Sequence, residues 1–343
     1  MVGFCISGGI GDAILLSPII CRIRDTFSGV EVAVFDPNIV TIIELIGVKC
    51  HLIDSFIHLS ADDMVSGTHS FLKSRGCSLA IWNCFRTDHD GFCNHFFALD
   101  SSFKELVSEK RFLYYKSLSE VMGKQISPVR RTDYNLEVAR FLCSEKDYFA
   151  DWKRYGFKVS HEDVTLKVPN INNEALEKLS PYCIVHDSKL DFNNVNGSIK
   201  AWFPDRWDEI SEYLSTKMNV IHFNNKNQKV FKGCIPVVEV LPEKRNFWDY
   251  FDFIRKSFLY VGTDSWPGHT AIFLPENKFL ILKGAVSYRW DHFLKYSSII
   301  RKGKCQCCEY LSLEKCIFGN GKKCCMEQIT VNDVKENIDL FLK

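Results

Sequence analysis

Two segments of the chain carry residue types that could do chemistry, and the first lies near the N-terminus. It reads Gly8-Gly9-Ile10-Gly11-Asp12 and joins a short apolar run to a segment with helical spacing. Glycines permit a tight turn there, and a helix N-terminus offers free N–H groups. A carboxylate on such an open turn is suited to take a proton from a substrate hydroxyl. The alternative is that Asp12 only caps the helix.

The second segment, "TDSWPGHT" at 263–270, follows an apolar strand and opens a helix. Ser265 could cap that helix and leave other backbone N–H groups available. Asp264 could accept hydrogen bonds from sugar or ribose hydroxyls, and His269 could meet a phosphate oxygen. The alternative is a capped helix with a core histidine and no ligand.

Lys200 stands shortly before a helix that Pro204 initiates. A lysine beside a helix N-terminus suits a diphosphate, because its charge and the backbone donors converge on one anion. The alternative is a solvated surface lysine. Lys200 and the 263–270 turn both follow strands at one edge of the expected sheet, where doubly wound folds bind ligands. The neighbouring Trp202, Phe203 and Trp207 are expected to be packing residues.

A rival interpretation of the first segment is a dinucleotide-binding fingerprint, with Asp36 as the acid that binds the ribose. Two residues argue against it. Counted from Gly9, the third glycine position holds Ile14, and Asp12 puts a negative charge where a pyrophosphate would lie. An NAD(P)-dependent oxidoreductase that uses Asp36 therefore remains the second hypothesis.

Six of the 15 cysteines fall between Cys305 and Cys325, and the other nine are scattered singly in apolar contexts. The scattered cysteines are expected to pack as small reduced hydrophobes. The cluster could supply four thiolates to a tetrahedral zinc or iron ion that clamps a loop. Reduced thiols or a disulfide are the alternative.

The first half of the chain alternates apolar runs with helical spacing, which is typical of a parallel sheet covered by helices. Expected strands are 2–7, 30–36, 49–54 and 77–85, and expected helices are 12–27 and 38–47. Residues 86–135 have weak periodicity and are expected to form helices and loops.

The second half repeats this alternation after a polar boundary within 151–180. Expected strands are 182–188, 219–225, 259–264 and 279–284, and expected helices are 204–218 and 246–257. The fold class is therefore α/β, with two doubly wound domains at 1–165 and 166–330. The second domain includes the cysteine-rich segment 305–325, and a closing helix follows at 331–343.

Composition limits the function classes. The chain has 343 residues with 46% hydrophobic and 25% charged content, which is typical of a globular protein with a sizeable core. The net charge of +1 gives no reason to expect a nucleic-acid partner. No run of eighteen apolar residues occurs, so at most peripheral membrane contact is expected. The N-terminus lacks the pattern of a signal peptide, and a cytoplasmic location is expected.

Four motifs, in order along the chain, resemble glycosyltransferase family nine. This family contains the heptosyltransferases of lipopolysaccharide core assembly and relatives that glycosylate autotransporter proteins. The motifs are "GGIGDAILLSPIICRIRDTFSGVEVAV", "KAWFPDRWDEI", "LYVGTDSWPGHTA" and "CCMEQITVNDV". They span nearly the whole chain, which is more specific than any one motif.

The resemblance implies a GT-B fold: two Rossmann-like domains facing a cleft, the first for the acceptor and the second for the nucleotide sugar. It implies that Asp12 is the catalytic base and that Gly9 and Gly11 belong to the acceptor side. Lys200 matches the lysine that binds the diphosphate and stabilises its departure. The implied reaction is an inverting, metal-independent transfer that needs no catalytic cofactor.

In the donor site, the resemblance assigns Ser188, Asp264, Ser265 and His269 to the nucleotide sugar. The implied donor is a nucleoside-diphosphate heptose, with ADP-heptose the first candidate. The implied acceptor is a hydroxyl of a glycan, of lipopolysaccharide or of a protein. Trp266 departs from the family, which usually has glycine there, and this departure supports a third hypothesis of a non-catalytic module that binds a sugar nucleotide.

Some relatives carry a structural metal in a comparable cysteine cluster. The resemblance aligns Cys325 with the Cys-Met position of the family. It therefore favours Cys305, Cys308, Cys316 and Cys325 as the ligands of a structural zinc or iron ion.

Overall fold

The structure is a computed structural model, and it describes residues 1–6, 9–11, 13–14, 17, 20–21, 24, 29–53, 61–86, 91–98, 174–188, 200–224, 228–241, 247–274, 276–284, 296–302 and 324–343. For residues 61–66, 79, 81–86, 91–98, 175 and 324 it describes the backbone alone. The chain divides into two compact units, Met1–Val168 and Pro169–Lys343, here called the N-terminal and C-terminal units. The predicted domain limit between 165 and 166 lies outside the described residues and stays a prediction.

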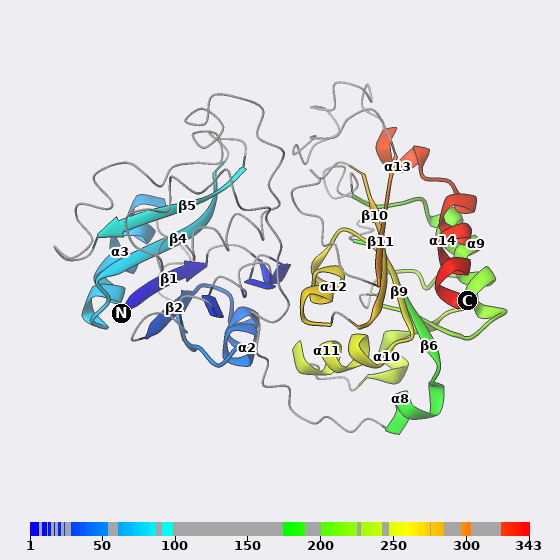
Figure 1. The fold of residues 1–343 in the computed structure, drawn as a ribbon, viewed down its shortest axis with the longest axis horizontal. Coiled ribbons are helices and arrows are strands. Elements are labelled where there is room, and N and C mark those ends of the chain that lie inside the picture. Colours follow the sequence, from blue (N-terminus) through cyan, green and yellow to red (C-terminus); the bar gives the residue numbers. More distant parts are fainter. Residues whose placement is uncertain are drawn as a thin grey trace. The chain divides into compact units, whose positions relative to one another are not determined.

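The N-terminal unit contains a five-stranded sheet in the order β3-β2-β1-β4-β5 (Figure 1). The strands are β1 (Val2–Ile6), β2 (Val30–Val34), β3 (Lys49–Leu52), β4 (Leu79–Arg86) and β5 (Gly91–Ala98). The first four are parallel to their neighbours, whereas β5 runs antiparallel to β4. Every residue of β1 and β2 is buried, as expected for central strands of a parallel sheet covered on both faces.

Helix α2 (Pro37–Leu45) shows how local sequence sets the limits of an element. Asp36 caps its N-terminus by accepting a hydrogen bond from the backbone N–H of Asn38, and Pro37 occupies the first turn. The helix ends where Gly47 adopts a φ of 72°, a conformation that glycine takes without strain. The sequence predicts this helix correctly.

Two elements of the N-terminal unit differ from the prediction. Residues 91–98 form strand β5, although helices and loops are expected there. Helix α3 (Ala61–Ser74) has no counterpart in the prediction, because its polar residues and Gly67 weaken the helical periodicity. The predicted parallel sheet itself is confirmed.

The C-terminal unit contains a six-stranded sheet in the order β11-β10-β9-β6-β7-β8. The strands are β6 (Tyr182–His186), β7 (Asn219–His222), β8 (Ile235–Pro236), β9 (Leu259–Thr263), β10 (Lys278–Lys283) and β11 (Ser297–Arg301). All neighbouring pairs are parallel. The chain builds β7 and β8 outward from one side of β6 and then β9 to β11 from the other, so the strand order reverses between β6 and β9.

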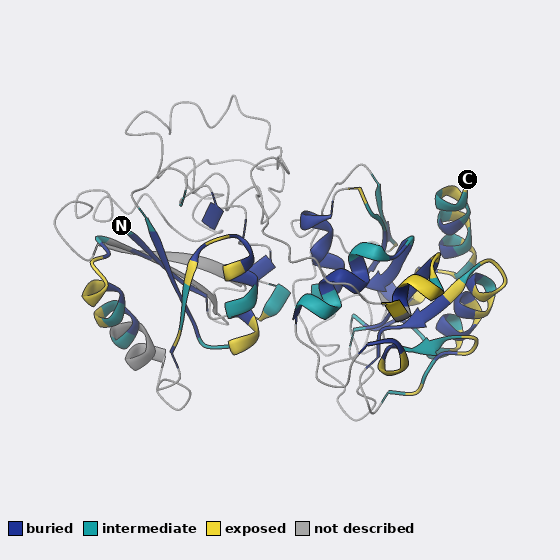
Figure 2. Ribbon diagram, turned by 90° about the horizontal axis from the view of Figure 1, so that it is seen from below, coloured by how far each residue is buried: buried dark blue, intermediate teal, exposed yellow. Residues whose placement is uncertain are grey.

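Helices cover both faces of this sheet. Figure 1 shows α9 (Pro204–Ser215) and α14 (Val331–Leu342) on one face, and α11 (Phe247–Lys256) and α12 (Trp266–His269) on the other. Further helices are α8 (Glu174–Leu179), α10 (Val237–Val240), the 3-10 helix η6 (Thr270–Phe273) and α13 (Cys324–Gln328). In Figure 2, α14 has both buried and exposed residues, as an amphipathic helix on a core does.

The core beneath α9 and α14 contains the tryptophans that the sequence assigns to packing. Trp202 and Trp207 are fully buried, and their rings meet edge to face. Phe203 is partly buried against the same core. The indole N–H of Trp202 donates to the carbonyl of Ile329, which ties the loop before α9 to the segment between α13 and α14. The packing role predicted for these three aromatic residues is confirmed.

Within the described ranges, no helix combines the length and the apolar character that crossing a bilayer requires.

Candidate functional site

The polar residues of the C-terminal unit gather where β6 and β9 end. His186, at the end of β6, is followed by Asp187 and Ser188, and Thr263, at the end of β9, is followed by Asp264. The two strands are hydrogen-bonded neighbours, with His186 opposite Gly262. Ligands of doubly wound sheets bind at the carboxyl ends of the strands, at the point where the strand order reverses. This edge of the sheet is therefore the candidate site.

Lys200 reaches this edge and meets Asp264. Its ammonium lies 3.1 Å from Asp264 Oδ2, with the lysine side chain 31% exposed and the aspartate 4%. The loop that carries Lys200 is held in place by Asp187, whose Oδ1 accepts a hydrogen bond from the backbone N–H of Trp202. The structure thus brings into contact two residues 64 positions apart that the sequence analysis expects at the same edge of the sheet.

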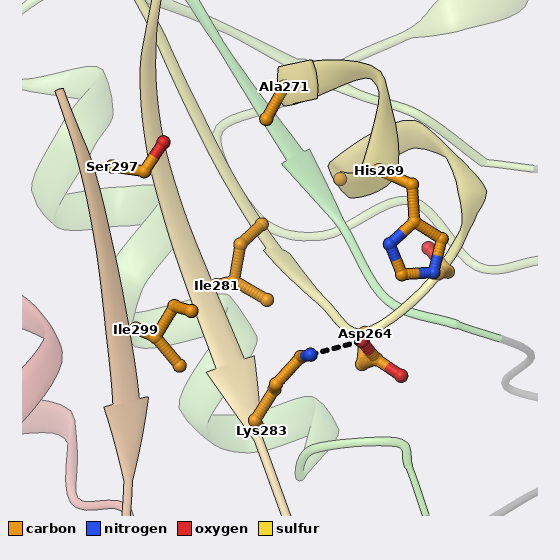
Figure 3. A pocket seen from close by; sticks show the side chains of 9 residues that line it. Asp264, His269, Ala271, Ile281, Lys283, Ser297 and Ile299 are labelled. Carbon is orange, nitrogen blue, oxygen red and sulfur yellow. Dashed lines mark ion pairs between the residues drawn. The ribbon is translucent and has the colours of Figure 1, made fainter. Parts of the chain in front are cut away.

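A second lysine binds the other oxygen of the same carboxylate. Lys283, the last residue of β10, places its ammonium 3.0 Å from Asp264 Oδ1 (Figure 3). Burial alone would raise the pKa of Asp264, but Lys283, then Lys200, then His269 outweigh it and hold that pKa well below its usual value. Asp264 is thus a buried, ionised carboxylate between two cations.

Ser265 occupies the N-cap position of α12, but its side chain makes no capping hydrogen bond. Its hydroxyl lies 3.2 Å from Nδ1 of His186, and the hydroxyl of Tyr260 lies 3.0 Å from the same nitrogen. The side-chain cap that the sequence suggests is therefore wrong, because the imidazole competes for the hydroxyl. Burial lowers the pKa of His186 to about 3, so this imidazole is neutral.

Ser188 is tied to the end of β9. Its backbone N–H donates to Thr263 Oγ1 over 2.7 Å, and the two hydroxyl oxygens lie 2.9 Å apart. Thr263 also contacts Asp187. These contacts fix the two strand ends relative to each other, so that Ser188 lies beside the residue that precedes Asp264.

His269 is buried at the end of α12 and is one of the residues that line a small pocket. The lining combines polar side chains with the apolar Ile281 of β10 and Ile299 of β11 (Figure 3). The pocket is lined by Asp264, Ser265, Gly268, His269, Ala271, Ile281, Lys283, Ser297 and Ile299. A carboxylate, two ammonium groups and hydroxyls at one edge suit an anionic ligand that also carries hydroxyls.

In the N-terminal segment, Asp12 lies outside the described residues, so its proposed role as a base stays a prediction. Gly9 and Gly11 are described, and the carbonyl of Gly9 accepts a hydrogen bond from the N–H of Ala13 at the start of a helix. Among the described residues, none would lie within 4 Å of a methyl group added at Gly9. Packing against the described part of the chain therefore does not require a glycine at that position.

Asp36, the residue on which the dinucleotide hypothesis depends, is the N-cap of α2. One of its oxygens accepts hydrogen bonds from both the backbone N–H and the side-chain amide of Asn38. This structural role accounts for an acidic residue at the end of β2 without a ribose.

Of the four cysteines predicted to bind metal, only Cys325 lies within the described residues. It is buried, with 6% of its surface exposed, on helix α13. In the part of the chain that the structure describes, no three His, Cys, Asp or Glu residues are placed to hold a metal ion. The metal site stays a prediction, since Cys305, Cys308 and Cys316 lie outside that part.

The sequence prediction gives no role to four residues of this edge: His186, Asp187, Thr263 and Lys283. The only signal for Lys283 is a lysine that ends the strand "KFLILK" after four apolar residues. A terminal lysine of that kind is usually solvated, and only the contact with Asp264 reveals its burial.

No family model and no curated protein sequence matches the chain. Solved structures do match over nearly its whole length. A family 9 glycosyl transferase from Veillonella parvula DSM 2008 has a TM-score of 0.64 and 13% identity, covering 99% of this chain and 96% of its own. The chain has the fold of the family 9 glycosyltransferases. The resemblance inferred from the four motifs is confirmed for the fold.

Two further similar structures hold a nucleotide-sugar analogue and iron, respectively. E. coli heptosyltransferase WaaC with ADP-2-deoxy-2-fluoro heptose has a TM-score of 0.53 and 12% identity, and the match covers 98% of each chain. The iron-containing dodecameric glycosyltransferase TibC from enterotoxigenic E. coli H10407 has a TM-score of 0.57 and 11% identity. That match covers 99% of this chain and 75% of TibC.

Proposed function

We propose that the protein is an inverting glycosyltransferase of the GT-B type, with an acceptor-binding N-terminal half and a donor-binding C-terminal half. The donor is a nucleoside-diphosphate sugar, and ADP-heptose is the first candidate because similar structures are heptosyltransferases solved with ADP or an ADP-heptose analogue. The acceptor is a hydroxyl of a glycan, of lipopolysaccharide or of a protein, and the proposed location is the cytoplasm.

The observation that carries this proposal is the pairing of Lys200 with Asp264 where β6 and β9 end. A sugar nucleotide has two kinds of group that match this pair. Its diphosphate suits the ammonium, and its sugar and ribose hydroxyls suit the carboxylate. Ser188, Ser265 and His269 lie at the same edge and are proposed to add polar contacts to the donor.

In the proposed reaction, the carboxylate of Asp12 takes the proton of the acceptor hydroxyl. The acceptor oxygen attacks the anomeric carbon from the face opposite the diphosphate, and the bond between that carbon and the diphosphate oxygen breaks. The configuration inverts, and the nucleoside diphosphate leaves with the bonding electrons. Lys200 stabilises the charge that develops on the departing oxygens, and no step uses a metal or cofactor.

A structural zinc or iron ion held by Cys305, Cys308, Cys316 and Cys325 is part of the proposal. Four thiolates are a suitable donor set for either ion, and the similar TibC is iron-containing. Cys325 is buried, which fits a structural ligand and equally fits a packed thiol. Elemental analysis of the purified protein decides: one zinc or iron per chain supports the site, and none refutes it.

The test of the function has two steps. A thermal-shift panel of ADP-, UDP- and GDP-sugars identifies the donor, because a ligand that binds only the folded state raises the melting temperature. Release of nucleoside diphosphate from that donor, with glycan and protein acceptors, then tests transfer. Selective stabilisation without release on any acceptor would favour the non-catalytic module, and stabilisation by NAD(P) alone would favour the oxidoreductase.

A further inference from the structure

Lys283 is a buried cation that the proposed function does not use. It is 2% exposed and ends β10, a strand that lies between β9 and β11 and whose five preceding residues contain only one other polar side chain, Lys278. Burying an ammonium group is costly unless a counter-ion compensates it, and Asp264 is that counter-ion. Figure 3 shows the Lys283 side chain reaching from β10 to the residue that follows β9.

The two oxygens of Asp264 are divided between two lysines. Lys283 lies 3.0 Å from Oδ1, and Lys200 lies 3.1 Å from Oδ2. The group of three therefore carries a net charge of +1, which is one more positive charge than the carboxylate needs. One lysine can therefore bind an anionic ligand at this edge while the other stays paired with the Asp264 carboxylate.

The two lysines differ in their surroundings. Lys283 belongs to a strand inside the sheet and is almost fully buried, whereas the Lys200 side chain belongs to a loop and is 31% exposed. Lys200 is therefore the lysine with access to a ligand, and Lys283 is the lysine held on Asp264 by its strand.

We infer that Lys283 is a positioning residue: it holds and neutralises the Asp264 carboxylate, so that Lys200 can turn its ammonium to the diphosphate of the donor. The inference rests on the proposed function and adds a residue to its donor site. Without Lys283, the buried Asp264 would retain Lys200 as its main counter-ion, and Lys200 would bind the diphosphate less well.

Electrostatics support this division of roles. Among the described residues, the charged or titratable groups that shift the pKa of Asp264 are Lys283 from β10, Lys200 from the loop before α9, and His269 from α12. Lys283 lowers the pKa of Asp264 more than Lys200 does. Loss of the Lys283 charge therefore raises the pKa of Asp264, and as the pH falls through this raised pKa the carboxylate becomes neutral and releases Lys200.

The experiment compares Lys283→Met with wild type by titration calorimetry with ADP-heptose between about pH 5 and pH 8. We expect wild-type affinity to be nearly constant across this range. We expect Lys283→Met to bind about tenfold more weakly at pH 8, with an affinity that recovers as the pH falls. A variant that binds like wild type, or is weakened equally at every pH, would overturn the inference.

Lys278→Met is the matched control, since it makes the same change on the same strand. The Lys278 ammonium donates to the carbonyl of Phe341, away from Asp264. Its loss is expected to reduce stability and leave the pH profile of binding unchanged. If Lys283→Met does not fold, Lys283→Gln removes the charge but retains a hydrogen-bond donor, and the same pH dependence is expected.

Inorganic pyrophosphate, titrated in parallel, separates this inference from the identity of the donor. If wild type binds pyrophosphate but not ADP-heptose, the proposed donor is wrong, and the pH profiles of wild type and Lys283→Met with pyrophosphate decide the role of Lys283. If wild type binds neither, Lys200 receives no diphosphate and both proposals fail.

Discussion

The two glycine-containing turns of this protein follow the same local plan but differ in how tightly they are built. Each follows a buried parallel strand, β1 or β9, and each opens a helix. After β9, Asp264 is fixed between two lysines and Ser265 contacts a buried histidine. After β1, by contrast, a methyl group at Gly9 would meet none of the described residues.

This difference indicates where a substitution is expected to change both ligand binding and the stability of the fold. In the C-terminal unit the same charges that suit a diphosphate also neutralise each other in the fold, so a substitution affects both binding and stability. In the N-terminal unit a methyl group at Gly9 would touch no described residue, so a substitution of Gly9 is expected to affect chemistry more than folding.

The largest effect is expected at the N-terminal turn. Asp12→Asn should lower kcat by about 10²- to 10⁴-fold, because a general base contributes that much, while donor affinity stays within a factor of two or so of wild type. Steady-state kinetics and calorimetry measure both. Asp36→Asn is the matched control, since asparagine also caps helices, and it should leave kcat unchanged. Normal transfer by Asp12→Asn would remove the proposed base.

At the C-terminal turn, Lys200→Met should weaken binding of ADP-heptose by about 10- to 100-fold, because a charge-assisted contact to the diphosphate is lost. The fold should survive, since Lys283 still neutralises Asp264. Lys229→Met serves as control: that side chain is 79% exposed and lies 3.9 Å from Asp208. Equal affinities for the two variants would exclude Lys200 from the donor site.

Replacing one glycine in each region, Gly262 in β9 and Gly9 after β1, with alanine tests how the two regions differ in stability. A methyl group at Gly262 would lie 2.7 Å from ring carbons of Tyr260, which is fully buried and contacts His186. Gly262→Ala should therefore destabilise the protein by about 1–3 kcal/mol in denaturant unfolding. Gly9→Ala should change the unfolding free energy by less than about 0.5 kcal/mol. The reverse order would contradict the comparison.

A pH dependence of stability is expected in the C-terminal unit. Burial lowers the pKa of both His186 and His222 from 6.5 to about 3, so the unfolded chain takes up protons at a higher pH than the folded chain. Their contribution is complete above about pH 6.5 and declines as the pH falls toward 3, by at most about 1.4 kcal/mol per pH unit for each histidine. Chemical unfolding at pH 7.5 and 5 measures this. His186→Gln should flatten the profile, and an unchanged slope would argue against a buried neutral His186.

Most strands and helices of the fold could be predicted, because local sequence determines them. Apolar runs such as "VEVAV" form strands, and Pro37 and Gly47 mark the two ends of α2. Strand β5 could not be predicted, since it is defined by its antiparallel pairing with β4 and not by a periodicity of its own residues. Of the donor-site candidates, Lys200 and Asp264 follow from their positions after strands. Lys283 does not, because its burial is set by the packing of β9 beside β10. The side-chain cap predicted for Ser265 is wrong because the Ser265 hydroxyl contacts Nδ1 of His186, at the end of β6, and not a backbone N–H of α12.

The most direct test is a crystal structure of the protein with the nucleoside-diphosphate sugar that stabilises it. The account predicts diphosphate oxygens within hydrogen-bond distance of the Lys200 ammonium, with Lys283 still on Asp264. A diphosphate bound instead at the glycine turn after β1, with Lys200 unchanged on Asp264, would contradict it.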